Sequence, residues 1–438
     1  MSKSKIFLLV SLIFLSANFI WLIYFDNQEY NPDFIFDKFY QFEAKVLDRD
    51  KKISGWNLLV EPKDLDNFSG KILLYTDLYP EYKQGDLISA SAKVYKPEPI
   101  IDESGKSFAY DKYLAKDGIY ATGYRPYIKR LGQERDFLFY IYQVKNYFWQ
   151  NLNNYLVEPS SSLAKGMLLA ARREIPDELR NDFARVGLSH IIAISGLHIA
   201  IIVWLIQSFL IFIGLNRKKS FIALLIILLL YLFLIAFPSS ALRASLMVVF
   251  VLLGPFLGRN TPSVYSLVLV ADIFVLINPY VLLYDIGFQL SFLAVLGLLF
   301  YVNFFKRVLV FIPERFKIRE VFSVTLAAQV FTWPLIVYNF NIFSIAAPLV
   351  NFIILPILPL VLVFSFALAI FGFYSPIAQV ISWPLFLILK FIAEVAKYFA
   401  RIPYTYFQFD NFSLLYMCLS LAFMFLLTYV LKPLDYED

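Results

Sequence analysis

Long apolar runs fill most of this chain, and the first one stands at its beginning. Within residues 1–25, Lys3 and Lys5 precede an apolar run of roughly 20 residues, which as a helix is long enough to cross a bilayer. The run ends in Trp21 and Tyr24 and has no small-residue cleavage site, which favours a retained anchor over a signal peptide. The two lysines place the N-terminus in the cytoplasm.

Residues 26–133 have a different pattern, with short half-apolar segments separated by turn residues. Alternation is clear at Ile88, Ala90, Ala92 and Val94, as in a strand with one buried face. Four or five short strands in about 100 residues predict a small all-β domain of the OB-like type. A first helix that leaves the cytoplasm would make this domain extracytoplasmic.

The remaining chain predicts helices. Residues 134–186 mix aromatic and polar side chains and predict amphipathic interfacial helices. Residues 187–431 predict nine further spans, near 188–214, 221–237, 241–257, 263–277, 284–304, 320–338, 343–371, 376–400 and 412–431. The fold class is therefore a polytopic α-helical membrane protein of about 10 spans, give or take 2, with residues 432–438 as a short cytoplasmic tail.

Composition and charge agree with this membrane topology. Hydrophobic residues make up 59% of the chain and charged residues 17%, with a net charge of +5. Basic clusters at 217–219, Arg259 and 306–319 follow the second, fourth and sixth spans, which places all three in the cytoplasm. We expect a multi-pass protein of the cytoplasmic membrane. The lone Cys418 excludes an internal disulfide and a multi-cysteine metal site.

The stretch 187–200, GLSHIIAISGLHIA, holds both histidines of the chain, His190 and His198. On one continuous helix they would lie about 12 Å apart along the axis and about 80° apart around it, which argues against a shared metal ion. Ser195 and His198 would share a face, so an intramembrane serine hydrolase is one alternative function. Ala193 stands where a nucleophile elbow has its first glycine, which weakens that alternative.

Short polar breaks such as FPSSALRA and YDIGFQLS interrupt the apolar runs. Irregular backbone at membrane depth is tolerated where it lines an aqueous cavity, and Arg243 can contact an anion there. This pattern favours a channel or transporter, and a small-anion or lipid transporter is a second alternative. No cofactor is expected.

Segment order then identifies a family resemblance. GLSHIIAISGLHIAII resembles the signature of the ComEC family of competence proteins. Four further segments resemble that family in order, namely SFAYDKYLAKDGIYATGY, LRASLMVVFVLLGPFLGRN, NPYVLLYDIGFQLSFLAVLGLL and LAAQVFTWPLIVYNFNIFSIAAPLVNFIILPILPL. The resemblance covers nearly the whole chain.

The resemblance implies a channel component, not an enzyme, that translocates single-stranded DNA across the cytoplasmic membrane during natural transformation. Its implied partners are single-stranded DNA, membrane lipid, a separate nuclease, a DNA-receptor protein, a cytoplasmic ATP-dependent motor and further copies of itself as a homo-oligomer. The signature and pore candidates that it transfers are Gly187, His190, Ser195, Gly196, His198, Arg243, Asp285, Gln289, Ser291, Gln329, Pro334 and Asn351.

The chain departs from the long family members in two ways. We expect a short form without their C-terminal metallo-β-lactamase-like domain, because two histidines cannot supply an H-x-H-x-D-H site. Many members also carry a cysteine pair in the outer domain, and residues 26–133 have no cysteine.

The outer domain has no basic excess to attract DNA. Residues 26–133 hold 16 Lys and Arg against 18 Asp and Glu, a difference of −2, whereas phosphate binders normally have a basic patch. Aromatic side chains can stack on bases instead, and the candidates are Phe39, Tyr40, Trp56 and Tyr75. Packing inside a barrel is the alternative role of the same rings.

Overall fold

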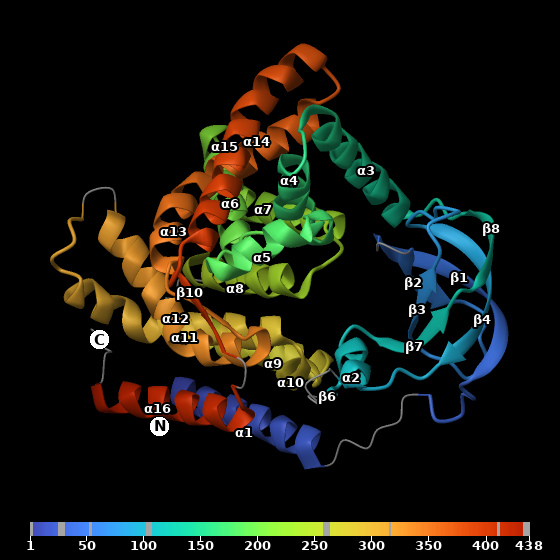
Figure 1. The fold of residues 1–438 in the computed structure, drawn as a ribbon, viewed down its shortest axis with the longest axis horizontal. Helices are drawn as coiled ribbons and strands as arrows, with labels where there is room; N and C mark the ends of the chain where they lie inside the picture. The colour runs from blue at the N-terminus through green and yellow to red at the C-terminus, as the bar shows by residue number, and fades with distance from the viewer. Residues whose placement is uncertain are drawn as a thin grey trace. The chain divides into compact units, whose positions relative to one another are not determined.

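A computed structural model describes residues 3–24, 31–51, 55–101, 107–256, 263–314, 317–409 and 412–431 (Figure 1). The chain divides into two compact units. The barrel unit comprises Met1–Lys145 and Val268–Ile286, and the helical unit comprises Asn146–Leu267 and Gly287–Asp438. Arg259, Arg315 and the predicted tail 432–438 lie outside the described residues.

Five strands of the barrel unit close into a small barrel. They are β1 (Lys38–Lys51), β2 (Trp56–Pro62), β3 (Lys71–Thr76), β4 (Asp86–Tyr95) and β7 (Ile119–Tyr124). Their order is β1-β2-β3-β7-β4, and β1 also pairs with β4, which closes the ring. β3 and β7 are parallel and the other pairs are antiparallel. This arrangement confirms the predicted OB-like domain.

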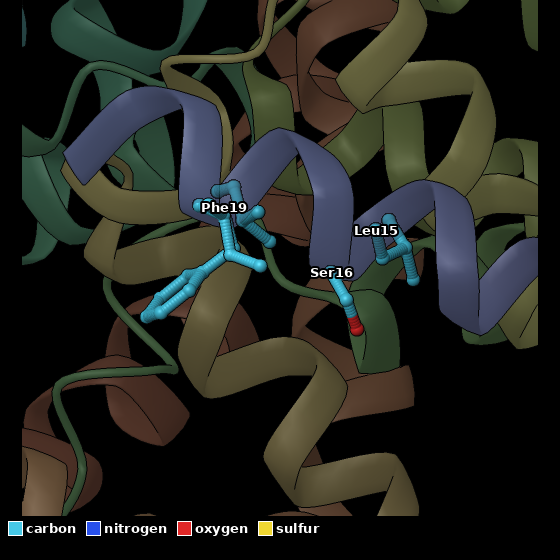
Figure 2. A pocket seen from close by; sticks show the side chains of 5 residues that line it. Leu15, Ser16 and Phe19 are labelled. Carbon is cyan, nitrogen blue, oxygen red and sulfur yellow. The ribbon is translucent and has the colours of Figure 1, made fainter. Parts of the chain in front are cut away.

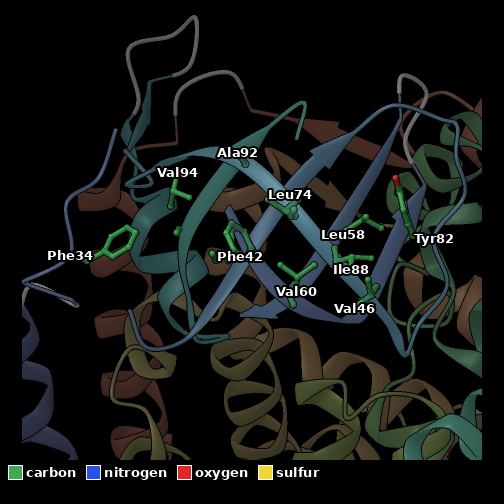
Figure 3. Packing of buried hydrophobic residues seen from close by; sticks show 14 residues of the cluster. Phe34, Phe42, Val46, Leu58, Val60, Leu74, Tyr82, Ile88, Ala92 and Val94 are labelled. Carbon is green, nitrogen blue, oxygen red and sulfur yellow. The ribbon is translucent and has the colours of Figure 1, made fainter. Parts of the chain in front are cut away.

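The barrel interior follows from strict alternation along its strands. Every second residue of β4 is buried, and Ile88, Ala90, Ala92 and Val94 are 0–1% exposed. Figure 3 shows apolar side chains of several strands turned into one core, including Phe42, Leu58 and Leu74. A bulge between Val46 and Asp48 bends the long strand β1, which lets it pair with two neighbours.

Shorter elements complete the barrel unit. β8 (Tyr127–Gln133) pairs with β4, β5 (Ile100–Ile101) pairs with β6 (Ser107–Phe108), and α2 (Tyr110–Ala115) precedes β7. α1 (Lys3–Tyr24) contacts α10 (Val281–Tyr284). An apolar hollow there is lined by Leu15, Ser16, Phe19 and Ile20 of α1 with Leu282 (Figure 2). Ser16 supplies the one polar side chain among the described residues that line it.

Lys45 of β1 forms an ion-pair cluster with Asp136 and Glu134, which lie just before α3 (Phe137–Tyr155). Asp136 also accepts a hydrogen bond from the Phe139 amide at 2.9 Å and so caps that helix. Burial lowers the pKa of Lys45, but its hydrogen bonds to Asp136 and Glu134 outweigh burial and leave it raised. Hydrogen bonding to Lys45 lowers the pKa of Glu134. Burial raises the pKa of Asp136, but its hydrogen bonds to Lys45 and to the backbone outweigh burial and leave the pKa lowered.

The helical unit begins with short helices, of which α4 is fully buried, and continues with longer apolar ones. Its elements after α3 are α4 (Ser160–Leu169), η1 (Arg172–Glu174), α5 (Asp177–Arg185), α6 (Gly196–Phe212), α7 (Arg217–Leu234), α8 (Ser239–Phe256), α9 (Ser263–Ile277), α11 (Ile286–Val308), α12 (Ile318–Phe340), β9 (Ile342–Ser344), α13 (Ala347–Ile354), η3 (Leu355–Ile357), α14 (Leu358–Phe371), α15 (Ser375–Arg401), β10 (Tyr406–Gln408) and α16 (Leu414–Leu431). α9 and α11 each place residues in both units. α14 and α15 form an antiparallel pair (Figure 1).

The described helices confirm a membrane protein. Five are long and apolar enough to cross a bilayer, at Phe7–Tyr24, Ile286–Val308, Ile318–Phe340, Ala347–Phe371 and Ser375–Arg401. Four shorter apolar helices lie at Gly196–Phe212, Ser239–Leu253, Val264–Ile277 and Leu414–Val430. Large apolar side chains remain exposed on many of them, such as Phe212 and Val380, as expected for surfaces that face lipid. The count of about ten spans stays a prediction.

Two predicted spans differ from the observed helices. The span near 188–214 begins as a helix only at Gly196, because Ser195 caps it there and residues 188–195 are not helical. The span near 343–371 becomes helical only at Ala347, after β9, and then runs to Phe371 with the 3-10 turn η3 between α13 and α14. Pro356 and Pro359 lie at this turn, where a missing N–H cannot continue the helical hydrogen bonds.

Candidate functional site

The signature segment begins with a helix end that only glycine fits well. α5 ends at Arg185, and the Leu188 amide donates to the Phe183 carbonyl at 2.7 Å while the Gly187 amide donates to the Ala184 carbonyl at 3.2 Å. This is a Schellman end, with Gly187 at φ +77°. A Cβ built on Gly187 would lie 2.5 Å from the Cβ of Ala347. The turn therefore packs closely against the first residue of α13.

Ser195 and His198 form the start of α6. Ser195 is the N-cap and His198 occupies the third helical position of a capping box. His198 Nδ1 lies 3.0 Å from Ser195 Oγ and accepts a hydrogen bond from the Ser195 amide at 3.3 Å. The contact that suggested a serine hydrolase is thus also the contact that caps a helix. His190 is exposed in the turn that precedes α6. The sequence predicted that both histidines lie on one helix, and that prediction was wrong.

His198 is fully buried, and within the described part of the chain its Nε2 has no hydrogen-bond partner. Those same residues contain no group of three or more His, Cys, Asp or Glu side chains that could hold a metal ion.

The amino-terminal ends of α6 and α8 lie together. Ser240 Oγ donates to the Ile194 carbonyl at 2.6 Å, and a Cβ on Gly196 would lie 3.7 Å from the Cβ of Ala244. Neither helix carries an acidic residue in its first turn. Arg243 of α8 is 1% exposed, with its guanidinium carbon 5.7 Å from the ring centroid of Phe288 on α11. Two positive helix ends and a buried cation therefore occupy one region of the helical unit.

The other pore candidates are spread over α11, α12 and α13. Ser291 Oγ donates to the Phe288 carbonyl at 3.0 Å, and Gln289 and Gln329 are half-buried. Pro334 is buried inside α12, where it cannot donate to the carbonyl one turn earlier. Asn351 of α13 is 6% exposed. Asp285, also buried, belongs to the barrel unit and immediately precedes α11.

Several buried hydroxyls of the helical unit were missed at the sequence level. Among described residues, these hydroxyl side chains have an oxygen without a hydrogen-bond partner: Ser245, Ser266, Ser323, Thr325, Ser344 and Ser365. Buried polar groups normally find protein or water partners. Lone Ser and Thr residues inside apolar runs were the available signal, although such residues also serve ordinary helix packing.

The four stacking candidates of the barrel do not share one environment. Trp56 donates its indole N–H to the Leu78 carbonyl at 3.0 Å, and Tyr40 donates its hydroxyl to the Ile35 carbonyl at 2.8 Å. Both rings pack against the barrel core. Phe39 is 80% exposed, and Tyr75 stacks on Tyr124 with ring centroids 4.8 Å apart.

Comparison with known proteins supplies the family. Residues 167–434 match the family model described as Competence protein. ComE operon protein 3 of Bacillus subtilis (strain 168) is 26% identical over 362 residues, covering 81% of this chain and 45% of that protein. The chain therefore spans about half the length of the curated relative it matches. No solved structure matches the chain.

Proposed function

This chain belongs to the competence protein family, and from that premise we propose that it forms a path for single-stranded DNA across the cytoplasmic membrane during natural transformation. The observation that best supports the path is the region where α6 and α8 begin. A DNA strand carries one negative charge per nucleotide, and this region combines two positive helix ends with the buried Arg243.

Buried polar groups further support a hydrated path. A charged side chain such as Arg243 inside a membrane bundle is costly and normally faces a cavity or a substrate route. The unpartnered oxygens of Ser323, Asn351 and Ser365 add hydrogen-bonding capacity on α12, α13 and α14. The 3-10 turn η3 between α13 and α14 loosens the helical hydrogen bonding in the middle of the Ala347–Phe371 span, and such local departures are tolerated where neighbouring protein or water satisfies the freed groups.

The rest of the proposal concerns topology and partners. We place the N-terminus in the cytoplasm and the barrel outside, where it meets the incoming strand. Degradation of the second strand belongs to a separate nuclease domain or protein, because this chain's two histidines cannot form the metal site of a metallo-β-lactamase-like nuclease. A DNA receptor outside, an ATP-dependent motor inside and a second copy of this chain are the proposed protein partners.

The test compares Arg243→Gln with Arg180→Gln in a strain whose own copy is deleted. Arg180 lies on α5 with a 45% exposed side chain, so it controls for loss of an arginine without loss of a buried one. We expect Arg243→Gln to lower uptake of labelled DNA into a nuclease-protected state about tenfold at equal membrane abundance, because charged hydrogen bonds contribute about 1.5–3 kcal/mol. Arg180→Gln should match the wild type.

A deletion strain that takes up DNA at the wild-type rate would overturn the proposed function. Normal uptake by the Arg243→Gln variant would remove Arg243 from the path.

A small-anion transporter is the second candidate, because the same positive region fits any anion. Vesicles that hold the purified protein distinguish the two functions. Uptake of labelled phosphate or sulfate that single-stranded DNA does not inhibit would favour the transporter.

A further inference from the structure

One outward face of the barrel carries a row of aromatic rings that crosses four strands. Tyr75 of β3 pairs with Tyr124 of β7, and Lys93 of β4 pairs with Phe39 of β1. The β4–β7 register pairs Tyr95 with Thr122, and its continuation sets Lys93 opposite Tyr124. These residues alternate with core residues such as Leu74 and Val94, which Figure 3 shows inside the barrel, so their own side chains point outward.

The rings form a platform and are not core residues. We call Phe39, Tyr75, Tyr95 and Tyr124 the aromatic row. Tyr75 and Tyr124 stack with an interplanar angle of 9°, and Tyr95 meets Tyr124 edge-on at 5.7 Å. Phe39 is 80% exposed and Tyr124 is 56% exposed, so large apolar surface stays open on the row.

Helix α2 holds one end of the row in place. The Tyr75 hydroxyl lies 2.9 Å from the Tyr110 hydroxyl at the start of α2. At the other end of α2, Asn278 donates its side-chain amide to the carbonyls of Ala115 and Lys116, both at 3.2 Å. These bonds satisfy carbonyls that a helix end leaves open, and they fix α2 against the connector between α9 and α11.

Positive charge lies along the same face, although residues 26–133 as a whole carry no basic excess. Lys93 Nζ is 4.9 Å from the ring centroid of Tyr95. Its ion pair with Asp37 is 3.9 Å long with both side chains well exposed, which makes it weak. Arg125 follows Tyr124 directly in an exposed position, and its amide donates to the Tyr75 carbonyl at 2.8 Å. The face thus combines flat rings with separated cations.

We propose that the aromatic row binds the unpaired bases of single-stranded DNA, with Lys93 and Arg125 contacting phosphates. This site rests on the proposed function and gives it an entry point outside the membrane. Single-stranded nucleic acid is the occupant because every base offers a π-face to an open ring, while cations between the rings serve the backbone. A duplex hides those faces, so double-stranded DNA binds the row weakly.

The test measures binding of a fluorescent oligothymidylate to the full-length protein in detergent by anisotropy, at several salt concentrations. Phe39→Ala and Tyr124→Leu should each weaken binding about tenfold, since base stacking on one ring contributes on that order. Tyr124→Phe keeps the ring and should bind like the wild type. Tyr140→Ala removes a 61% exposed tyrosine from α3 and serves as the matched control.

The salt dependence of binding distinguishes the contribution of the aromatic rings from that of the cations. Lys93→Gln should reduce the slope of log affinity against log salt by about one, whereas Tyr124→Leu should leave the slope unchanged. Near-normal melting of Phe39→Ala and Tyr124→Leu shows that each variant is folded.

The outcomes distinguish this site from the function on which it rests. Phe39→Ala and Tyr124→Leu variants that are folded and bind the oligonucleotide at wild-type affinity overturn the aromatic row, even where DNA uptake remains. Equal affinity for duplex and single strand also overturns it. A wild-type protein that neither binds nor imports DNA overturns the proposed function and the row together.

Discussion

Gly187→Ala tests how closely the signature turn packs against α13. The substitution forces an L side chain into φ +77°, which costs about 1–2 kcal/mol. It also sets the new Cβ 2.5 Å from the Cβ of Ala347, far inside van der Waals contact. A crowded site of this kind adds about 1–3 kcal/mol, because neither Cβ can rotate away. The total is about 2–5 kcal/mol.

Gly214→Ala supplies the matched control. Gly214 has φ +85°, so it incurs the same backbone strain, but a Cβ there meets no atom within 4 Å. The thermal unfolding midpoint, followed by tryptophan fluorescence in one detergent at one scan rate, should fall by about 2 °C for Gly214→Ala and about 5 °C for Gly187→Ala. The difference between the two variants measures the steric contact alone.

Ala347→Gly should rescue Gly187→Ala, because it removes the atom at 2.5 Å. Its own cost is below the value of about 1 kcal/mol for glycine inside a helix, because Ala347 is the first residue of α13. A double-mutant cycle should therefore show a favourable interaction of about 1–3 kcal/mol. Equal midpoints for Gly187→Ala and Gly214→Ala, or no interaction in the cycle, would refute the close packing of this turn on α13.

Three further predictions concern other parts of the chain. The pKa values of Glu134 and Asp136 are lowered in the folded protein, so these carboxylates stabilise the barrel at neutral pH and this contribution is lost as pH falls below about 4. The pKa of Lys45 is raised, so its contribution to stability persists up to at least pH 10.5. Lys45→Met should therefore flatten the acid side of a melting-point-against-pH curve. The Ser195→Ala substitution should lower the free energy of unfolding by about 1 kcal/mol, because α6 loses its N-cap. A fluorophosphonate probe should label neither this variant nor the wild type. Labelling of the wild type alone would support the serine hydrolase alternative. Gly297→Ala should lower the melting point, because its Cβ would lie 2.2 Å from the Ala327 carbonyl oxygen, and an unchanged midpoint would contradict the close approach of α11 to α12.

The sequence predicted the barrel well because the alternation of apolar and polar residues that specifies each strand is a local pattern. Ile88, Ala90, Ala92 and Val94 alternate in the sequence and all lie in the core. Of the aromatic row, Phe39 and Tyr75 were stacking candidates from the sequence, whereas Tyr95 and Tyr124 were missed. Tyr124 joins them through the parallel pairing of β3 with β7, and that register depends on strands more than 40 residues apart.

The start of the first span after the barrel was predicted wrongly for a physical reason. The apolar residues of LSHIIAI look like the first turns of a membrane helix, yet Gly187 ends one helix and Ser195 caps the next. A serine before an apolar run was the available signal for the cap. For the pore candidates, residue types can be read from the sequence but their partners cannot, because the contact of Arg243 with the ring of Phe288 joins two helices far apart in the chain.

The bonds from Asn278 to α2 also bear on the order in which the protein is made. The Ala115 carbonyl and the Asn278 amide are 163 residues apart in the chain. At about 5–20 residues per second, a ribosome delivers Asn278 about 8–30 seconds after Ala115. The barrel strands, which all lie before residue 134, can pair during that interval. The last turn of α2 gains its partner only after the segment that contains α6, α7 and α8 has been synthesised, so anchoring of the barrel's helix is a late event of biogenesis.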